Sequence, residues 1–181
     1  MTHVQVGAFE IQVWDQVPAH YATLRQRAEL VDEYGLQSRE PGIISTVTVA
    51  PQGGQPALLV SQHRDLDSQG FPLGVVVVPE TGLVLIGAAQ RLLAYDLQGP
   101  RKLWEDHVEV GILGLARHDE TILMSGELTL TAYSLQGQER WSMFVEPPWD
   151  YAVQDGQLTV DVMGHVQLFS LCAGPTGGAS D

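Results

Sequence analysis

Carboxylates and aromatic rings supply most of the side chains that could do chemistry in this sequence. The segment from Val145 to Tyr151 carries two acids and two aromatic residues around Pro147-Pro148, a composition typical of binding surfaces. The predicted surface for a partner or ligand consists of Glu146, Trp149, Asp150, Tyr151 and Asp161. The alternative is that the prolines fix a connection between sheets while Trp149 and Tyr151 enter the core.

A second acidic segment has part of a calcium-loop pattern. Asp65, Asp67, Gln69 and Gly70 fall on the first, third, fifth and sixth positions of such a loop. Val76 stands at the twelfth position, where a bidentate glutamate would complete the shell. The segment is therefore a weak metal candidate. A solvated turn, whose short side chains bond to their own backbone, is the favoured interpretation.

The sequence shows no familiar catalytic pattern. There is no Gly-x-Ser-x-Gly elbow, no glycine-rich phosphate loop and no pairing of cysteine with histidine. The histidines have no metal-ligand spacing; they are His3, His20, His63, His107, His118 and His165. We therefore assign no catalytic residue and no cofactor, and a protein without catalytic activity is favoured over an enzyme.

The charge of the chain restricts its partners. Twenty-two acidic and 9 basic residues give a formal net charge of -13, which repels nucleic acid and anionic membranes and favours a basic protein partner. Solubility alone is the simpler explanation of this charge. The single cysteine, Cys172, indicates a reducing, cytoplasmic setting, and the start of the sequence lacks the pattern of a signal peptide.

A repeated stretch dominates the second half of the chain. Ala94-Tyr95-Asp96-Leu97-Gln98-Gly99 returns as Ala132-Tyr133-Ser134-Leu135-Gln136-Gly137, and more faintly as residues 166–171. Tyr95, Tyr133 and Phe169 are therefore equivalent, at intervals of 38 and 36 residues that each hold four short strands. This period is typical of a four-stranded propeller blade, and Trp104 and Trp141 follow the first two copies as predicted packing residues.

The residues Ala94, Asp96, Gly99 and Trp104 resemble the Ala-x-Asp…Gly…Trp signature of quinoprotein-like, or pyrroloquinoline-quinone-type, propeller repeats. The resemblance covers residues 73–171 and implies that the tryptophans dock between blades. It implies no quinone site, because the docking repeat does not bind the cofactor. The turn after Asp96 is one residue shorter than in the family, Ser134 replaces the aspartate, and the third copy lacks the glycine and the tryptophan.

The predicted fold is mainly β, a small or incomplete propeller in one domain over residues 1–172, with a two-sheet sandwich as the alternative. Strands are expected at 4–14, with a bulge near Gly7, and at 43–50 and 57–62. Apolar residues at helical spacing predict a helix over about 19–34, ended by Gly35. Residues 173–181 are predicted to be a disordered tail.

Two functional hypotheses follow. The first is a non-catalytic protein-binding or scaffold module, including an inhibitor of a basic protein such as a nuclease toxin. An open stack of blades would also leave a face for a homodimer. The second is a small-molecule-binding or hydrolytic domain that uses Glu146, Asp150 and Asp161 near the mouth of the blades.

Overall fold

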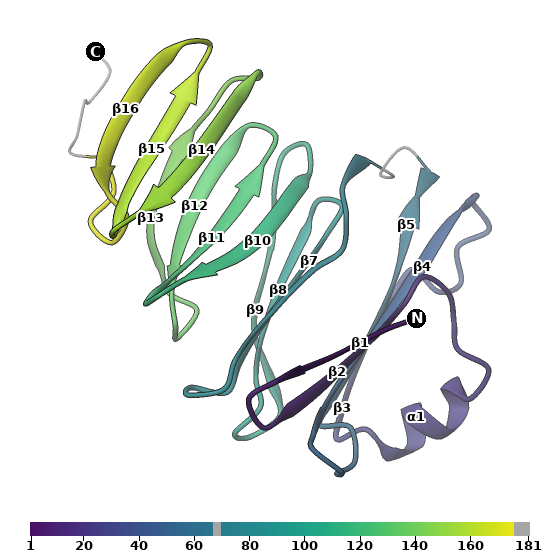
Figure 1. Cartoon of the computed structure of the whole chain (residues 1–181). Coiled ribbons are helices and arrows are strands. Elements are labelled where there is room, and N and C mark those ends of the chain that lie inside the picture. The colour runs from purple at the N-terminus through teal and green to yellow at the C-terminus, as the bar shows by residue number, and fades with distance from the viewer. Residues whose placement is uncertain (67–69, 176–181) are drawn as a thin grey trace.

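The computed structural model describes residues 1–66 and 70–175. Within these residues the chain forms sixteen strands and one α-helix, and the strands make four sheets of five, four, four and three strands (Figure 1). The mainly β, blade-like architecture predicted from the repeat is therefore confirmed. The sheets follow one another along the stack in the order of the sequence.

The N-terminal half builds the five-stranded sheet, in the order β1-β2-β4-β5-β3. Its strands are β1 (Thr2–Val6), β2 (Phe9–Trp14), β4 (Gly42–Pro51), β5 (Leu58–Asp65) and β3 (Leu30–Tyr34). β1 and β2 form an antiparallel hairpin whose turn contains Gly7 at φ 58. The expected bulge at Gly7 is thus wrong, because this glycine turns the chain through a left-handed conformation.

The predicted helix over 19–34 is wrong in its second half. α1 spans only Tyr21–Arg27, and Ala28 is extended at ψ 135. The next residues form β3, which pairs in parallel with β5, and this pairing begins where Glu29 N–H donates to the Pro56 carbonyl at 3.0 Å. The edge of β5 satisfies backbone groups that a helix would satisfy internally, so tertiary pairing outweighs the local three- and four-residue spacing.

The other three sheets are antiparallel and contain their strands in chain order. The second sheet contains β6 (Gly74–Val78), β7 (Leu83–Ala88), β8 (Arg91–Asp96) and β9 (Arg101–His107). The third contains β10 (Ile112–His118), β11 (Thr121–Gly126), β12 (Thr129–Ser134) and β13 (Glu139–Phe144). The fourth contains β14 (Trp149–Gln154), β15 (Gln157–Val162) and β16 (His165–Ser170).

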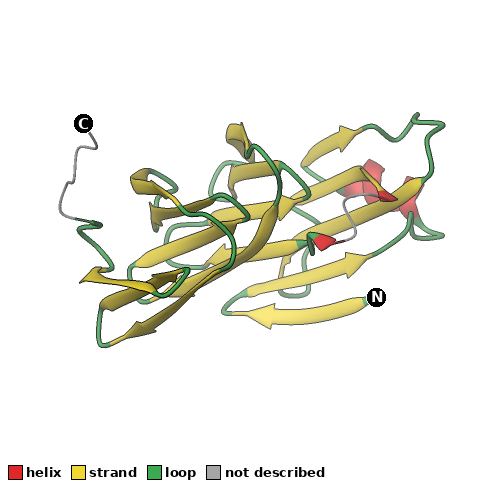
Figure 2. Ribbon diagram, turned by 90° about the horizontal axis from the view of Figure 1, so that it is seen from above, coloured by secondary structure: helices red, strands yellow, loops and turns green. Residues whose placement is uncertain are grey.

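Three apolar cores lie between consecutive sheets. Val49 of the first sheet packs with Leu93 of the second, Leu85 of the second packs with Ile122 of the third, and Leu123 of the third packs with Leu158 of the fourth. No core of the described residues joins the first sheet to the fourth, and the termini lie at opposite ends of the stack (Figure 2). The blades therefore form an open, incomplete propeller, and the two-sheet sandwich is excluded.

The repeat tryptophans lie at two of these junctions. The Trp104 indole N–H donates to the carbonyl oxygen of Gly137 at 2.9 Å, and that of Trp141 donates to the carbonyl oxygen of Leu171 at the same distance. Each indole thus bonds to the turn that ends the third strand of the following sheet. Trp104 stacks on Tyr133, and Trp141 meets the edge of Phe169.

A glycine accompanies each tryptophan in the neighbouring turn. Gly137 and Gly174 both have φ 77, and a Cβ on Gly174 would lie 2.5 Å from Trp141. Gly174 therefore supplies, one residue later, the glycine that the third copy lacks in sequence. It belongs to the predicted tail, of which residues 176–181 lie outside the described part.

Candidate functional site

The structure divides the surface predicted around Trp149 into two faces. Trp149 and Tyr151 stack on each other with ring centroids 6.1 Å apart and pack against the core between the third and fourth sheets. The Trp149 indole N–H donates to the carbonyl oxygen of Glu127 at 2.9 Å. The two rings thus hold β14 against the third sheet, while Glu146 is exposed in the connection before them.

Asp150 and Asp161 occupy the other face of the fourth sheet. They are direct neighbours across β14 and β15, and both are exposed. An Asp150 oxygen accepts the N–H of Tyr151, and an Asp161 oxygen accepts the N–H of Gly164, both at 2.8 Å. These contacts support local backbone, and the pair is separated from the two rings by the thickness of the sheet.

The weak metal candidate is described only in part. Asp65 ends β5, and its carboxylate lies 3.5 Å from His63 Nδ1. Asp67 and Gln69 lie outside the described residues. Among residues 1–66 and 70–175 there is no group of three or more histidine, cysteine, aspartate or glutamate side chains that could hold a metal ion.

A groove of about 520 Å³ lies beside Trp104, between β9 and the β12–β13 turn. Its lining residues are Leu103, Trp104, Glu105, Asp106, Tyr133, Gln136, Gly137, Gln138 and Glu139. The stacked rings of Trp104 and Tyr133, 5.5 Å apart at their centroids, form an aromatic floor. The carboxylate residues Asp106 and Glu139 line the groove beside this floor, and the volume is within the range of ligand pockets.

Tyr133 gives the groove a polar group. Its residue is 3% exposed, and its hydroxyl has no hydrogen-bond partner within the described ranges of the chain. Burial, followed by the negative charges of Asp106 and Glu139, raises the pKa of Tyr133. The hydroxyl therefore stays protonated, and it can donate or accept a hydrogen bond from a ligand in the groove.

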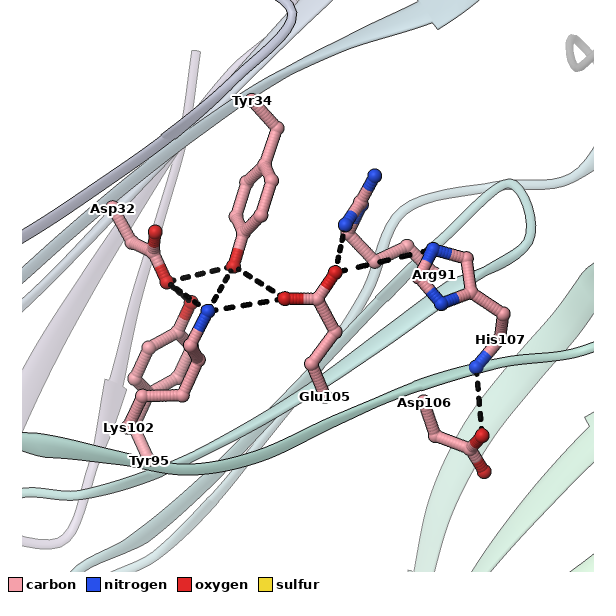
Figure 3. A network of polar contacts seen from close by, with 8 residues as sticks. All are labelled: Asp32, Tyr34, Arg91, Tyr95, Lys102, Glu105, Asp106 and His107. Carbon is pink, nitrogen blue, oxygen red and sulfur yellow. Dashed lines mark hydrogen bonds and ion pairs between the residues drawn. The ribbon is translucent and has the colours of Figure 1, made fainter.

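A polar network lies on the other side of β9, between the first and second sheets (Figure 3). The Tyr34 hydroxyl lies 2.7 Å from Asp32 Oδ2 and receives a hydrogen bond from Lys102 Nζ at 2.8 Å. Lys102 also lies 3.0 Å from a Glu105 oxygen, and the Tyr95 hydroxyl donates to Asp32 at 2.9 Å. Side chains from β3, β8 and β9 thus meet at this point.

The charges of this network satisfy one another. Arg91 pairs with Glu105 and lies 4.2 Å from the centroid of the Tyr34 ring. Burial opposes ionisation of Glu105, but the hydrogen bond from Lys102 and the charge of Arg91 outweigh it and lower its pKa. Burial, together with the neighbouring Asp32, raises the pKa of Tyr34 to about 12 although Lys102 opposes the shift. The network therefore fastens the first sheet to the second.

Sequence reasoning missed both the groove and the network. Asp32 and Tyr34 stood in the predicted helix, so their alignment beside β5 could not be foreseen. The groove had one signal in the sequence: Glu105 and Asp106 directly follow Trp104, whereas Ser142 and Met143 follow Trp141. This difference between two equivalent strands places acidic residues beside Trp104 and not beside Trp141.

The sheet order and the serial cores define an open, propeller-like β protein with one acidic aromatic groove. No protein-family model matches the chain, and no curated protein matches it. Within the part of the chain that the structure describes, no helix is both long and apolar enough to cross a membrane.

Several solved structures are similar to this chain at low identity. BamB from Moraxella catarrhalis is 12% identical, with 94% of this chain and 50% of BamB covered and a TM-score of 0.46. The computationally designed Ika4 protein is 15% identical, with 61% and 73% covered and a TM-score of 0.45. For a europium-containing methanol dehydrogenase the identity is 18%, the covered shares are 58% and 24%, and the TM-score is 0.40. The chain thus spans half or less of BamB and of the dehydrogenase.

Proposed function

We propose that this protein is a non-catalytic binding module for a basic partner protein, and that the groove beside Trp104 anchors an arginine or lysine side chain of that partner. The observation that carries the proposal is the aromatic floor of Trp104 and Tyr133 with carboxylates around it. A flat guanidinium group can stack on such rings while it pairs with carboxylates. The Tyr133 hydroxyl, which has no hydrogen-bond partner among the described residues, adds a specific hydrogen-bonding position.

The charge of the whole chain supports the same class of partner. A net charge of -13 creates a field that speeds the approach of a basic protein and is screened by salt. The groove would then supply the short-range contact, since a cation over an aromatic face contributes about 0.5–2 kcal/mol. An inhibitor of a basic enzyme is the narrower form of this proposal. A reducing, cytoplasmic setting suits the free, exposed Cys172.

The test measures binding of a peptide of alternating arginine and serine by isothermal titration calorimetry at two salt concentrations. We expect the double variant Asp106→Asn and Glu139→Gln to bind the peptide at least about ten-fold more weakly than the parent. This corresponds to a loss of roughly 1.4 kcal/mol of binding free energy. The matched control is Asp150→Asn with Asp161→Asn, which removes the same charge from the fourth sheet. Equal losses in the two double variants, or no binding at low salt, would contradict the proposal.

The same pair of variants tests the surface predicted from the sequence. Loss of binding only in the Asp150 and Asp161 variant would place the partner on the fourth sheet instead. The hydrolytic or small-molecule hypothesis with Glu146, Asp150 and Asp161 has one favourable observation, the direct pairing of the two aspartates across strands. It predicts turnover or ligand binding that disappears in this variant and persists in the groove variant.

A second copy of the chain is the partner that we propose for the edge of the fourth sheet. β16 pairs only with β15 in the described part of the chain, and its Val166 and Leu168 are 63% and 67% exposed. The strand has no acidic or basic residue apart from His165, so few charges oppose the pairing of two acidic copies at this edge. Light scattering should show a dimer that Leu168→Lys abolishes and that Val4→Lys, on the edge strand β1, leaves intact; a monomeric parent contradicts this.

A further inference from the structure

A small polar cavity lies between the first and second sheets, beside β5 and the β7–β8 turn. Its volume is about 170 Å³, and its lining includes Gln62, His63, Arg64, Asp65, Arg91 and His107. Two of the nine basic residues of the chain and two of its six histidines thus line one cavity. Such a concentration of basic side chains is unexpected in a protein with a net charge of -13.

Arg64 is a buried cation that forms no ion pair with the described residues, and the charge of Asp15 acts on it only from beyond ion-pair distance. It is 8% exposed, its Nε donates to Ser45 Oγ at 3.0 Å, and its Nη1 donates to the carbonyl oxygen of Phe71 at 2.9 Å. Both acceptors are neutral, and none of the ion pairs between described residues includes Arg64. Removing an unpaired charge from water costs free energy, so binding of an anion beside this guanidinium would be favourable.

Gln62 adds a second unsatisfied group to the same cavity. Its residue is 3% exposed, and its Nε2 has no hydrogen-bond partner within residues 1–66 and 70–175. A buried amide donor without an acceptor costs about 1–3 kcal/mol. The amide is therefore placed to donate to an oxygen atom that enters the cavity beside Arg64.

The remaining basic side chains of the cavity already have partners. Arg91 and His107 both approach Glu105 Oε1, the latter at 3.9 Å, and His63 lies between Asp65 and the carbonyl oxygen of Glu40. Glu105, Asp65 and Asp15 are the nearby acids that would oppose an anion. Glu105 pairs with Arg91, Asp65 lies beside His63, and Asp15 is close enough for its charge to act on Arg64. Arg64 and Gln62 are consequently the two groups left to bind a ligand directly.

We propose that this cavity binds a small oxyanion, a phosphate or carboxylate group, held by the Arg64 guanidinium and the Gln62 amide. The chemistry fits because arginine and amide donors both match the oxygen atoms of such groups. A ligand bound between β5 and the β7–β8 turn would contact the first two sheets at once. The site is separate from the groove beside Trp104, and the proposal does not depend on the binding of a basic partner.

Thermal unfolding of the full chain at constant ionic strength, with chloride replaced stepwise by inorganic phosphate or by acetate, tests the site. We expect a saturable rise in Tm of about 2–4 °C at several-fold excess over Kd. A rise with phosphate alone identifies a phosphate site, and a rise with both identifies a general oxyanion site. The absence of a saturable rise with either anion overturns the proposal.

Three variants locate the effect. Arg64→Gln and Gln62→Leu should each reduce the phosphate-dependent rise at least about five-fold, and Gln62→Leu decides the test if Arg64→Gln does not fold. Arg117→Gln is the matched control, since Arg117 pairs with Glu80 on the surface and lies outside the cavity. A phosphate effect that is unchanged in Gln62→Leu, or that is lost equally in Arg117→Gln, contradicts the assigned site.

Discussion

The junction between the first and second sheets is held differently from the two that follow it. At the later junctions, Trp104 and Trp141 each donate an indole hydrogen bond to the turn of the next sheet. At the first junction the corresponding turn of the second sheet contains Gly99, and a Cβ on Gly99 would have no neighbour within 4 Å. No indole lies against this turn; the hydroxyls of Tyr34 and Tyr95 meet at Asp32 instead.

This difference follows from the strand order of the first sheet, which is not one of the repeats. The second, third and fourth sheets repeat one pattern, so one tryptophan and one glycine can serve each junction between them. The first sheet has another strand order and ends in the parallel strand β3, which places Asp32 and Tyr34 where a blade would carry its fourth strand. The polar network thus joins the first and second sheets as an indole joins the later ones, because both supply directional hydrogen bonds beside an apolar core.

The largest expected loss of stability is at the last junction, between the third and fourth sheets. Trp141 is buried, and Trp141→Ala should lower the free energy of unfolding by about 3–5 kcal/mol through the cavity and the lost hydrogen bond. Trp141→Phe, the matched control, keeps most of the apolar contact and should lose only about 1–2 kcal/mol. Urea unfolding measures both values. A loss below about 1 kcal/mol in Trp141→Ala would show that this junction does not depend on the indole.

Trp104 should matter less for stability and more for binding. It is only half-buried because one side of its ring faces the groove, so Trp104→Ala should lower the free energy of unfolding by about 3 kcal/mol or less. The same variant should bind the arginine-serine peptide at least about ten-fold more weakly. If Trp104 and Trp141 variants weaken binding equally, the effect comes from general instability and not from the groove.

Substitutions of the two repeat tyrosines test the first junction against the second. Tyr95 is fully buried and donates to Asp32, so Tyr95→Phe should cost about 1.5–2 kcal/mol of unfolding free energy. Tyr133→Phe removes an equivalent hydroxyl that has no hydrogen-bond partner in the described part, and should change stability by less than about 0.5 kcal/mol. Equal effects of the two substitutions would mean that the network adds nothing at the first junction.

Alkaline pH should weaken the first junction. An unfolded tyrosine loses its proton near pH 10, whereas the pKa of Tyr34 is raised to about 12. The stability that Tyr34 contributes is therefore complete below about pH 10 and is lost as the pH rises toward about 12. Burial raises the pKa of Tyr95 in the same direction. Urea titrations across this range should show a smaller decline in Tyr34→Phe than in the parent, and an equal decline would contradict the assignment.

The local sequence pattern was enough to predict the strands of the blades. It was not enough to predict the parallel strand of the first sheet or which side chains share a face. The repeat of Ala-Tyr with its turn predicts the strands of residues 73–171, because alternation and β-branching are local properties. Residues 30–34 carry a spacing compatible with a helix, and only the free edge of β5 made them a strand. The aromatic and acidic residues near Trp149 share a segment, yet alternation along β14 sends Trp149 and Asp150 to opposite faces.

The sequence by itself determined the period, the mainly β content and the positions of the repeat tryptophans, since each depends on residues close together in the chain. Only the tertiary structure decided that the stack stays open, that Tyr34 meets Lys102, and that Trp104 and Tyr133 form a groove with acids around it. It also decided that Arg64 is buried without a carboxylate partner in the described residues. These features depend on contacts between distant segments, and burial and pairing there are set by the packing of whole sheets.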